Sequence, residues 1–302
     1  MQHTEPAASL LRHAKVSPVT YKLTHLTLRG WQSGAATGTP VLCLHGWLDN
    51  ANSFLPLAAE MPNVHLLAID LPGHGLSSHR SPEAHYYLFE YIADLVELIQ
   101  QQAWSALTII GHSMGGMIAS ALAAAMPELV ARLVLVDSIG FVTTPEVETA
   151  NQLRQAILSR EGRRKKFKPS YPSLADAAKA RQHQSDFAEL QARLLTQRGC
   201  FAVSTDPLTY GWTADMRLRE ASAQRLCVAQ AKGLLRQISC PVLALMAEDG
   251  IALMQQNLLL YQQCFTTLTV RHAPGGHHLH MTQPQAIAAV ITAFLAESDV
   301  VR

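Results

Sequence analysis

Short unbroken apolar runs recur along the chain, and stretches with helical spacing separate them. The runs lie at 40–44, 64–69, 107–110, 132–136, 241–246 and 268–271. Runs of this length are typical of parallel strands that are buried on both faces. The intervening stretches, at 50–60, 87–101, 114–126, 251–264 and 284–297, suit helices. Strands that alternate with helices predict an α/β fold, with a mainly parallel sheet and helices on both faces.

Two other regions depart from this rhythm. Residues 18–32 alternate between apolar and polar positions, which predicts a hairpin. Its expected inward positions are Tyr21, Leu23, Leu26, Leu28 and Trp31. Residues 138–226 contain no buried-strand run, and helical segments are expected around 146–160, 173–183 and 186–197.

An insertion of this size is too long for a plain connection between a strand and a helix. We therefore expect one α/β core domain, formed by 1–137 and 227–302, with 138–226 as a helical cap (lid) inserted into it. The cap is expected to lie over the carboxyl ends of the strands, where ligands bind in such folds.

Composition narrows the class of protein. The 302 residues are 48% hydrophobic and 16% charged, with a formal net charge of +1, as in a globular protein without a general affinity for nucleic acid or anionic membranes. No apolar run reaches the length of a membrane span, and neither a secretory signal nor a peroxisomal address is recognisable. The five scattered cysteines favour reduced thiols in a cytoplasmic protein. The basic run 163–168 is interpreted as a solvated face of the cap rather than a nucleic-acid site.

The first chemical signal is the run Gly111-His-Ser-Met-Gly115, between a predicted strand and a predicted helix. A serine on such a turn takes a strained backbone conformation, and small neighbours two positions away on each side avoid contact with the strand and the helix. Its hydroxyl then lies at the positive end of the helix, where developing negative charge is stabilised. Ser113 is therefore the candidate nucleophile.

Over its whole length the chain resembles an α/β-hydrolase. Four signatures follow one another in that family's order: His45-Gly-Trp47, Asp70-x-x-Gly73-x-Gly75-x-Ser77, Gly111-His-Ser-Met-Gly115, and a late His-rich loop before Pro284. The stretch 42–51 (Leu-Cys-Leu-His-Gly-Trp-Leu-Asp-Asn-Ala) is also similar to the branch described as serine hydrolase-like proteins, a branch that implies no definite substrate.

The resemblance implies a catalytic histidine seven residues before the proline that opens the final helix, which is His277. A serine hydroxyl needs such an imidazole to take its proton. His278 and His280 are alternative candidates in the same loop, and otherwise surface or supporting residues. The loop is not expected to hold a metal, because no carboxylate or cysteine stands beside it at ligand spacing.

The resemblance also implies an oxyanion hole made by the backbone N–H groups of Trp47 and Met114. The Trp47 side chain is expected to form a pocket wall. His45 and Asp70 are expected to support turns rather than to take part in catalysis.

The acid that orients the histidine is less clear. The family's usual position for it is occupied here by Gly250, and Asp249 stands one residue earlier. Asp137 follows the strand next to that of the nucleophile, a position that some relatives use for this role. Either carboxylate could orient the imidazole. We favour Asp137, because it ends its strand directly.

These observations predict a Ser–His–acid hydrolase of small or medium-sized carboxylic esters or thioesters, acting through an acyl-enzyme with no cofactor and no metal. Its expected partner is a small-molecule acyl substrate, without nucleic acid. Two alternatives are a carbon–carbon bond hydrolase of the same fold and a ligand-binding protein that has lost turnover. The sequence indicates neither the substrate's chain length nor an oligomeric state.

Overall fold

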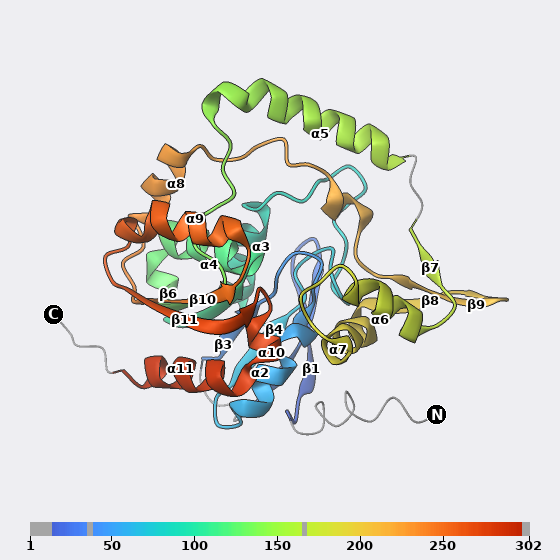
Figure 1. The fold of residues 1–302 in the computed structure, drawn as a ribbon, viewed down its shortest axis with the longest axis horizontal. Helices are drawn as coiled ribbons and strands as arrows, with labels where there is room; N and C mark the ends of the chain where they lie inside the picture. Colours follow the sequence, from blue (N-terminus) through green and yellow to red (C-terminus); the bar gives the residue numbers. More distant parts are fainter. Residues whose placement is uncertain (1–13, 35–38, 165–167, 298–302) are drawn as a thin grey trace.

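The computed structural model describes residues 14–34, 39–164 and 168–297. Its centre is an eight-stranded sheet in the order β1-β2-β4-β3-β5-β6-β10-β11 (Figure 1). The strands are β1 (Ser17–Lys22), β2 (Thr27–Ser33), β3 (Val41–Leu44), β4 (Leu66–Ile69), β5 (Leu107–His112), β6 (Val130–Val136), β10 (Val242–Asp249) and β11 (Leu268–Gly276).

The sheet is parallel from β4 to β11, and its two antiparallel pairs are β1–β2 and β2–β4. This arrangement confirms the predicted fold class. The predicted hairpin is β1–β2, and of its expected inward residues only Tyr21 is half-buried, the others being buried. The central strands are buried on both faces, as their unbroken apolar runs indicated.

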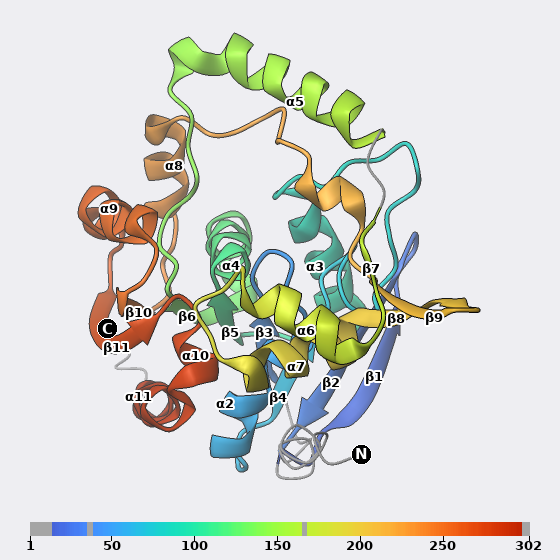
Figure 2. The same cartoon turned by 45° about the vertical axis from the view of Figure 1, so that its right-hand side comes forward.

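Helices cover both faces of the sheet (Figures 1 and 2). Each face has its own apolar cluster, because an amphipathic helix is stabilised by burying one stripe against the strands. On one face lie α3 (Glu90–Gln101), α4 (Met114–Ala125), α8 (Val228–Leu235) and α9 (Ala252–Tyr261). On the other lie α2 (Leu55–Glu60), α10 (Leu279–Thr282) and α11 (Pro284–Ala296).

Residues 138–226, which we call the insertion, contain more than the expected helices. The helices are α5 (Thr149–Arg164), α6 (Leu174–Gln182), α7 (Glu189–Gly199) and the short η3 (Glu146–Glu148) and η4 (Met216–Arg219). Between them β7 (Ser170–Tyr171), β8 (Cys200–Thr205) and β9 (Leu208–Trp212) form a second, three-stranded sheet that the sequence analysis missed. The side chains of β8 are mostly exposed, so this strand has no buried apolar run to mark it. Residues 165–167 of the basic run lie outside the described residues.

The insertion is bound to the core beside the end of β3 (Figure 2). The Asn50 amide donates to the carbonyl of Leu195 at 2.9 Å, and the Asn52 amide to that of Leu194 at 3.0 Å, both on α7. By contrast α5, drawn in light green, arches away from the sheet in both views. The described part of the chain contains no helix that is both long and apolar enough to cross a bilayer.

Candidate active site

Ser113 lies on a tight turn between β5 and α4. Its backbone has φ 52° and ψ −117°, a conformation that L residues rarely adopt. The turn is held because the Ser113 N–H donates to the carbonyl of Val136 on β6 at 3.1 Å. The serine is half-buried and stands immediately before the first residue of α4, at the positive end of that helix.

The two glycines around Ser113 are required by close backbone contacts. A Cβ on Gly111 would lie 2.6 Å from the carbonyl oxygen of Gly115, and one on Gly115 would lie 2.0 Å from the carbonyl oxygen of Leu44. No larger residue fits at either position without moving the strand or the helix. The glycines two positions before and after Ser113 therefore avoid backbone clashes, as expected from the sequence.

His277 and Asp137 are brought together from distant parts of the chain. His277 follows β11, and its Nδ1 donates to Oδ2 of Asp137 at 2.6 Å. The Asp137 carboxylate is fully buried and also accepts from the N–H of Ala247 at 3.2 Å and that of Ile251 at 3.4 Å. Asp137 itself has φ 38°, so the chain is forced into the left-handed region at the point where β6 ends. These contacts fix the carboxylate beside the imidazole.

Gly250 explains why the usual position of the acid holds a glycine. A Cβ at Gly250 would lie 2.6 Å from Oδ1 and 2.7 Å from Oδ2 of Asp137. The space beside the imidazole is thus filled from β6, and residue 250 must leave it free. Asp249 is exposed, at the end of β10, where it pairs with Gly276.

Ser113 and His277 line one pocket of about 250 Å³, which we call the Ser113 pocket. Trp47 borders it, and its indole N–H donates to the carbonyl of Leu218 in η4 at 2.8 Å. The tryptophan side chain is 48% exposed, so it forms a wall of the pocket rather than part of the core. Met114 is the first residue of α4, and its N–H therefore has no acceptor one turn earlier in the helix.

His45 and Asp70 support the neighbouring loops, as predicted. His45 is buried, accepts from the N–H of Leu71 at Nε2 (2.9 Å), and has its pKa lowered to about 4 by burial. The Asp70 carboxylate accepts from the N–H groups of Ala51 and Leu76 at 2.8 and 2.7 Å. It also binds the guanidinium of Arg198 on α7, at 2.8 Å, which joins the insertion to the core.

The alternative histidines of the loop, His278 and His280, are both buried, as is His112. The His112 Nε2 donates to the carbonyl of His277 at 2.9 Å, so the residue before the serine holds the histidine loop in place. Burial, and then the neighbouring imidazoles, keep the pKa of His112 well below its usual value. Burial likewise lowers the pKa of His280 to about 3, so both rings are neutral.

A buried ionic network around His278 lies beside His112 and His280, and the sequence analysis missed it. His278 Nε2 lies 3.3 Å from Oδ2 of Asp49, and its Nδ1 donates to Asp186 of the insertion. The guanidinium of Arg181, on α6, donates to the other Asp49 oxygen at 2.7 Å. Burial would lower the pKa of His278, but the carboxylates of Asp49 and Asp186 raise it to about 9. The imidazole is therefore a cation between two anions.

This network bears on metal binding. The sequence showed no carboxylate near the histidine loop at ligand spacing, yet the fold brings Asp49 there, and Asp49, His112 and His278 offer ligand atoms within 4.8 Å of one another. A metal ion would have to displace the proton on His278 Nε2, since a protonated nitrogen has no lone pair. The imidazolium and Arg181 already supply the positive charge that Asp49 needs. The residues fit a buried ion-pair network better than a metal site.

Comparison with known proteins identifies the family. The family model described as "alpha/beta hydrolase fold" matches residues 39–284. A serine hydrolase-like protein from Danio rerio is 33% identical over 293 residues, covering 89% of this chain and 85% of the relative. Serine hydrolase-like protein 2 from Homo sapiens is 31% identical over 294 residues, covering 90% of each chain.

Two solved structures are also similar to this chain. A hypothetical protein from Pseudomonas aeruginosa PAO1 is 36% identical, with a TM-score of 0.87 over 93% of this chain and 99% of the other. The thioesterase domain of the curacin biosynthetic pathway is 23% identical, with a TM-score of 0.80 over 92% of this chain and 99% of that domain. The second likeness concerns the fold alone.

Proposed function

Because the chain belongs to the α/β-hydrolase family, and within it to the serine hydrolase-like proteins, we propose that it is a serine hydrolase of small or medium-sized carboxylic esters or thioesters. One observation carries the proposal. Ser113 stands on a strained turn at the start of α4, in the same pocket as an imidazole whose Nδ1 is bonded to a buried carboxylate.

In the proposed reaction the Ser113 oxygen attacks the acyl carbon while His277 Nε2 takes the hydroxyl proton. Asp137 holds the imidazole in the tautomer that leaves Nε2 free to accept, and it stabilises the imidazolium that forms. The imidazolium then gives its proton to the departing alcohol or thiol. Water, deprotonated by the same imidazole, attacks the acyl-serine ester and releases the acid.

The negative charge on the carbonyl oxygen is assigned to the N–H groups of Trp47 and Met114. Support comes from their places in the fold, on the loop after β3 and at the first position of α4. Donors fixed in advance in a pocket with little water stabilise a transition state more than mobile solvent does. The contact between the Trp47 indole and Leu218 holds the first of these loops.

We assign the insertion the role of a cap that shapes the acyl site. Arg181, Gln184 and Arg219 belong to it and line the Ser113 pocket. Substrate selection by the insertion is expected because it supplies one wall of the space next to the nucleophile.

A fluorophosphonate probe tests the central assignment, because it reacts with an activated serine and not with an ordinary one. Wild-type protein should be labelled, and Ser113→Ala should be unlabelled and still folded, since the side chain faces a pocket. Ester turnover should fall by roughly 10³-fold or more. Ser120, which is buried on α4, provides a matched control as Ser120→Ala.

The outcome separates an enzyme from a ligand-binding protein of the same fold. A folded wild-type chain that is not labelled would favour the binding protein. Labelling that persists in Ser113→Ala would contradict the choice of nucleophile.

A further inference from the structure

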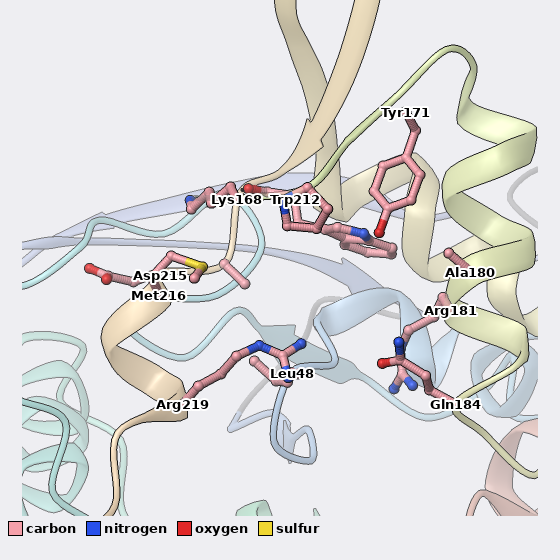
Figure 3. A pocket seen from close by; sticks show the side chains of 12 residues that line it. Leu48, Lys168, Tyr171, Ala180, Arg181, Gln184, Trp212, Asp215, Met216 and Arg219 are labelled. Atoms are coloured by element: carbon pink, nitrogen blue, oxygen red, sulfur yellow. Dashed lines mark hydrogen bonds between the residues drawn. The ribbon is translucent and has the colours of Figure 1, made fainter. Parts of the chain in front are cut away.

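A second cavity adjoins the Ser113 pocket and shares part of its lining. It has a volume of about 320 Å³ and lies between α6, β7, β9 and η4 of the insertion (Figure 3). We call it the Trp212 cavity. Four residues line both spaces and mark the boundary between them, which we call the passage: Leu48, Arg181, Gln184 and Arg219. A ligand that extends from Ser113 into the Trp212 cavity must therefore pass two guanidinium groups and one amide.

Arg219 is an exposed cation that has no anionic partner among the described residues. In the part of the chain that the structure describes, no carboxylate lies within ion-pair distance of its guanidinium. Its neighbour Glu220 is already bound by Arg163 and lies 2.6 Å from His85. The guanidinium instead lies 5.6 Å above the ring of Trp47, the residue that we assign to the oxyanion loop.

The other charges of the cavity leave this cation uncompensated. Asp215 lines the cavity, but Arg217 donates to both of its carboxylate oxygens, and Figure 3 shows the carboxylate turned away from Arg219. Lys168 donates to the carbonyl of Trp212 at 3.2 Å, and burial lowers its pKa although Asp215 opposes this. Arg181 is paired with Asp49. The passage therefore carries net positive charge.

The rest of the lining is apolar or aromatic. Trp212 and Tyr171 lie at one end of the cavity, Met216 borders it from the first position of η4, and Leu48 lies in the passage (Figure 3). Such a cavity accepts a short hydrocarbon or aromatic group, and the Tyr171 hydroxyl adds a polar group to its lining. The polar recognition is concentrated where Arg219 and Arg181 approach from opposite walls (Figure 3). Arg181 has a buried Nε–H there without a partner.

We propose that the substrate carries an anionic group, a carboxylate or a phosphate, that Arg219 binds in this passage. The inference rests on the proposed hydrolase function and specifies its substrate class. A guanidinium suits this role because its planar N–H groups match two oxygens of a carboxylate or phosphate. Uncharged acyl chains can enter the same cavity but leave the cation unpaired.

Matched pairs of alkyl esters test the proposal. Monoethyl adipate and ethyl hexanoate have acyl chains of equal length and differ in the terminal carboxylate, and both can be followed by titration of released acid. Wild type should prefer the charged ester. In Arg219→Gln the ratio of kcat/KM for the charged ester to that for the neutral ester should fall about tenfold, mainly through KM. Arg219→Lys should restore part of this ratio.

Arg154→Gln is the control for a change in net charge, because Arg154 is exposed on α5 and lines neither space. Its ratio should equal that of wild type. If kcat/KM fell equally for both esters in Arg219→Gln, the guanidinium would only support Trp47, and the proposal would be wrong. An unchanged ratio would exclude a carboxylate on the acyl chain as the group that Arg219 binds.

A thioester pair identifies which end of the substrate bears the charge. Hexanoyl-coenzyme A and the hexanoyl thioester of N-acetylcysteamine share an acyl group and differ in leaving-group phosphates. If Arg219→Gln lowers the ratio of kcat/KM for hexanoyl-coenzyme A to that for the N-acetylcysteamine thioester, the anion is a phosphate on the leaving group. If it lowers only the adipate ratio, the anion is a carboxylate on the acyl chain. Either result supports an anion site at Arg219, and no change in both overturns it.

Binding can be measured without turnover, so failure of the proposed reaction and failure of this inference are distinguishable. Trp47 and Trp212 lie on the two spaces and report ligands by their fluorescence. Adipate should perturb the emission of wild type, 1,6-hexanediol should not, and Arg219→Gln should weaken the adipate response about tenfold. Equal responses to both compounds would contradict the anion site even in a protein that hydrolyses esters.

Discussion

Replacing Asp137 by asparagine separates the charge of the proposed acid from its shape. The carboxylate lies 2.6 Å from His277 Nδ1 and is fully shielded from solvent. An amide of the same size can present its NH₂ group to the imidazole, which would favour the tautomer with the proton on Nε2. That tautomer cannot accept the proton of Ser113. We expect kcat to fall by about 10³- to 10⁴-fold, equivalent to roughly 4–5 kcal/mol of transition-state stabilisation.

Asp137→Ala should lose stability as well as turnover. The carboxylate accepts from the N–H groups of Ala247 and Ile251, and alanine would leave both donors unpaired beside a small cavity. An unpaired buried N–H costs about 1–3 kcal/mol, and the second of these bonds is long, so a loss on the order of 2–4 kcal/mol is expected. Asparagine keeps an acceptor oxygen and should lose less.

The assay is hydrolysis of p-nitrophenyl butyrate, with thermal melting to separate folding from catalysis. Asp249→Asn is the matched control, since Asp249 is an exposed carboxylate on the neighbouring strand, and it should cost tenfold or less. If Asp249→Asn lost most of its hydrolytic activity and Asp137→Asn kept it, the assignment of the acid would be refuted. If neither variant lost activity, the imidazole would be acting without an orienting acid.

Three further predictions follow from the same contacts. Gly250→Ala should push the Asp137 carboxylate away from the imidazole and lower kcat about 100-fold, and wild-type kinetics in this variant would contradict the close approach of 2.6 Å. The pKa of His278 is raised to about 9 from 6.5, so its stabilising effect should be complete below pH 6.5 and lost as pH rises through 9. Urea unfolding should therefore show a decline on the order of 3 kcal/mol over this range that is absent in His278→Gln, and equal slopes would exclude the network as its cause. Substitutions on the inner wall of the insertion, such as Met216→Ala, should shift the preferred acyl chain length more than the melting temperature, and an unchanged preference across graded esters would contradict the cap.

The sheet and the turn at Ser113 could be predicted because local pattern determines them. A strand buried on both faces must be apolar throughout, and a serine on a strained turn requires small residues such as Gly111 and Gly115 beside it. The sheet of the insertion could not be predicted in this way. Strand β8 is mostly exposed, so its sequence alternates little and lacks the apolar run that marks the core strands.

The sequence named two candidate acids but could not decide between them. Which carboxylate meets the imidazole depends on the packing of two neighbouring strands. Asp137 and Asp249 both end strands, and β6 pairs with β10. Only the structure shows that the chain at Gly250 passes against the Asp137 carboxylate. The glycine that looked like a departure from the family pattern is the residue that makes room for the acid.

The network around His278 was beyond sequence reasoning for a different reason. Its members come from three separate segments, and each looks like an ordinary charged residue in its own context. One weak signal existed, since Asp49 stands two residues after Trp47 in the motif that carries the resemblance. Nothing in the sequence marks Asp186, which meets His278 only because α6 and α7 are placed above the histidine loop.

That network changes how the insertion should be understood. Asp49 belongs to the loop of Trp47, His278 follows His277 directly, and Arg181 and Asp186 belong to the insertion. Lifting the insertion would remove Arg181 from the buried carboxylate of Asp49 and Asp186 from the imidazolium of His278. Breaking buried ion pairs in this way costs several kcal/mol. This part of the insertion therefore acts as a fixed wall and not as a freely opening lid. It follows that the groups we assign to the oxyanion loop and the histidine loop are positioned by the insertion as well as by the sheet.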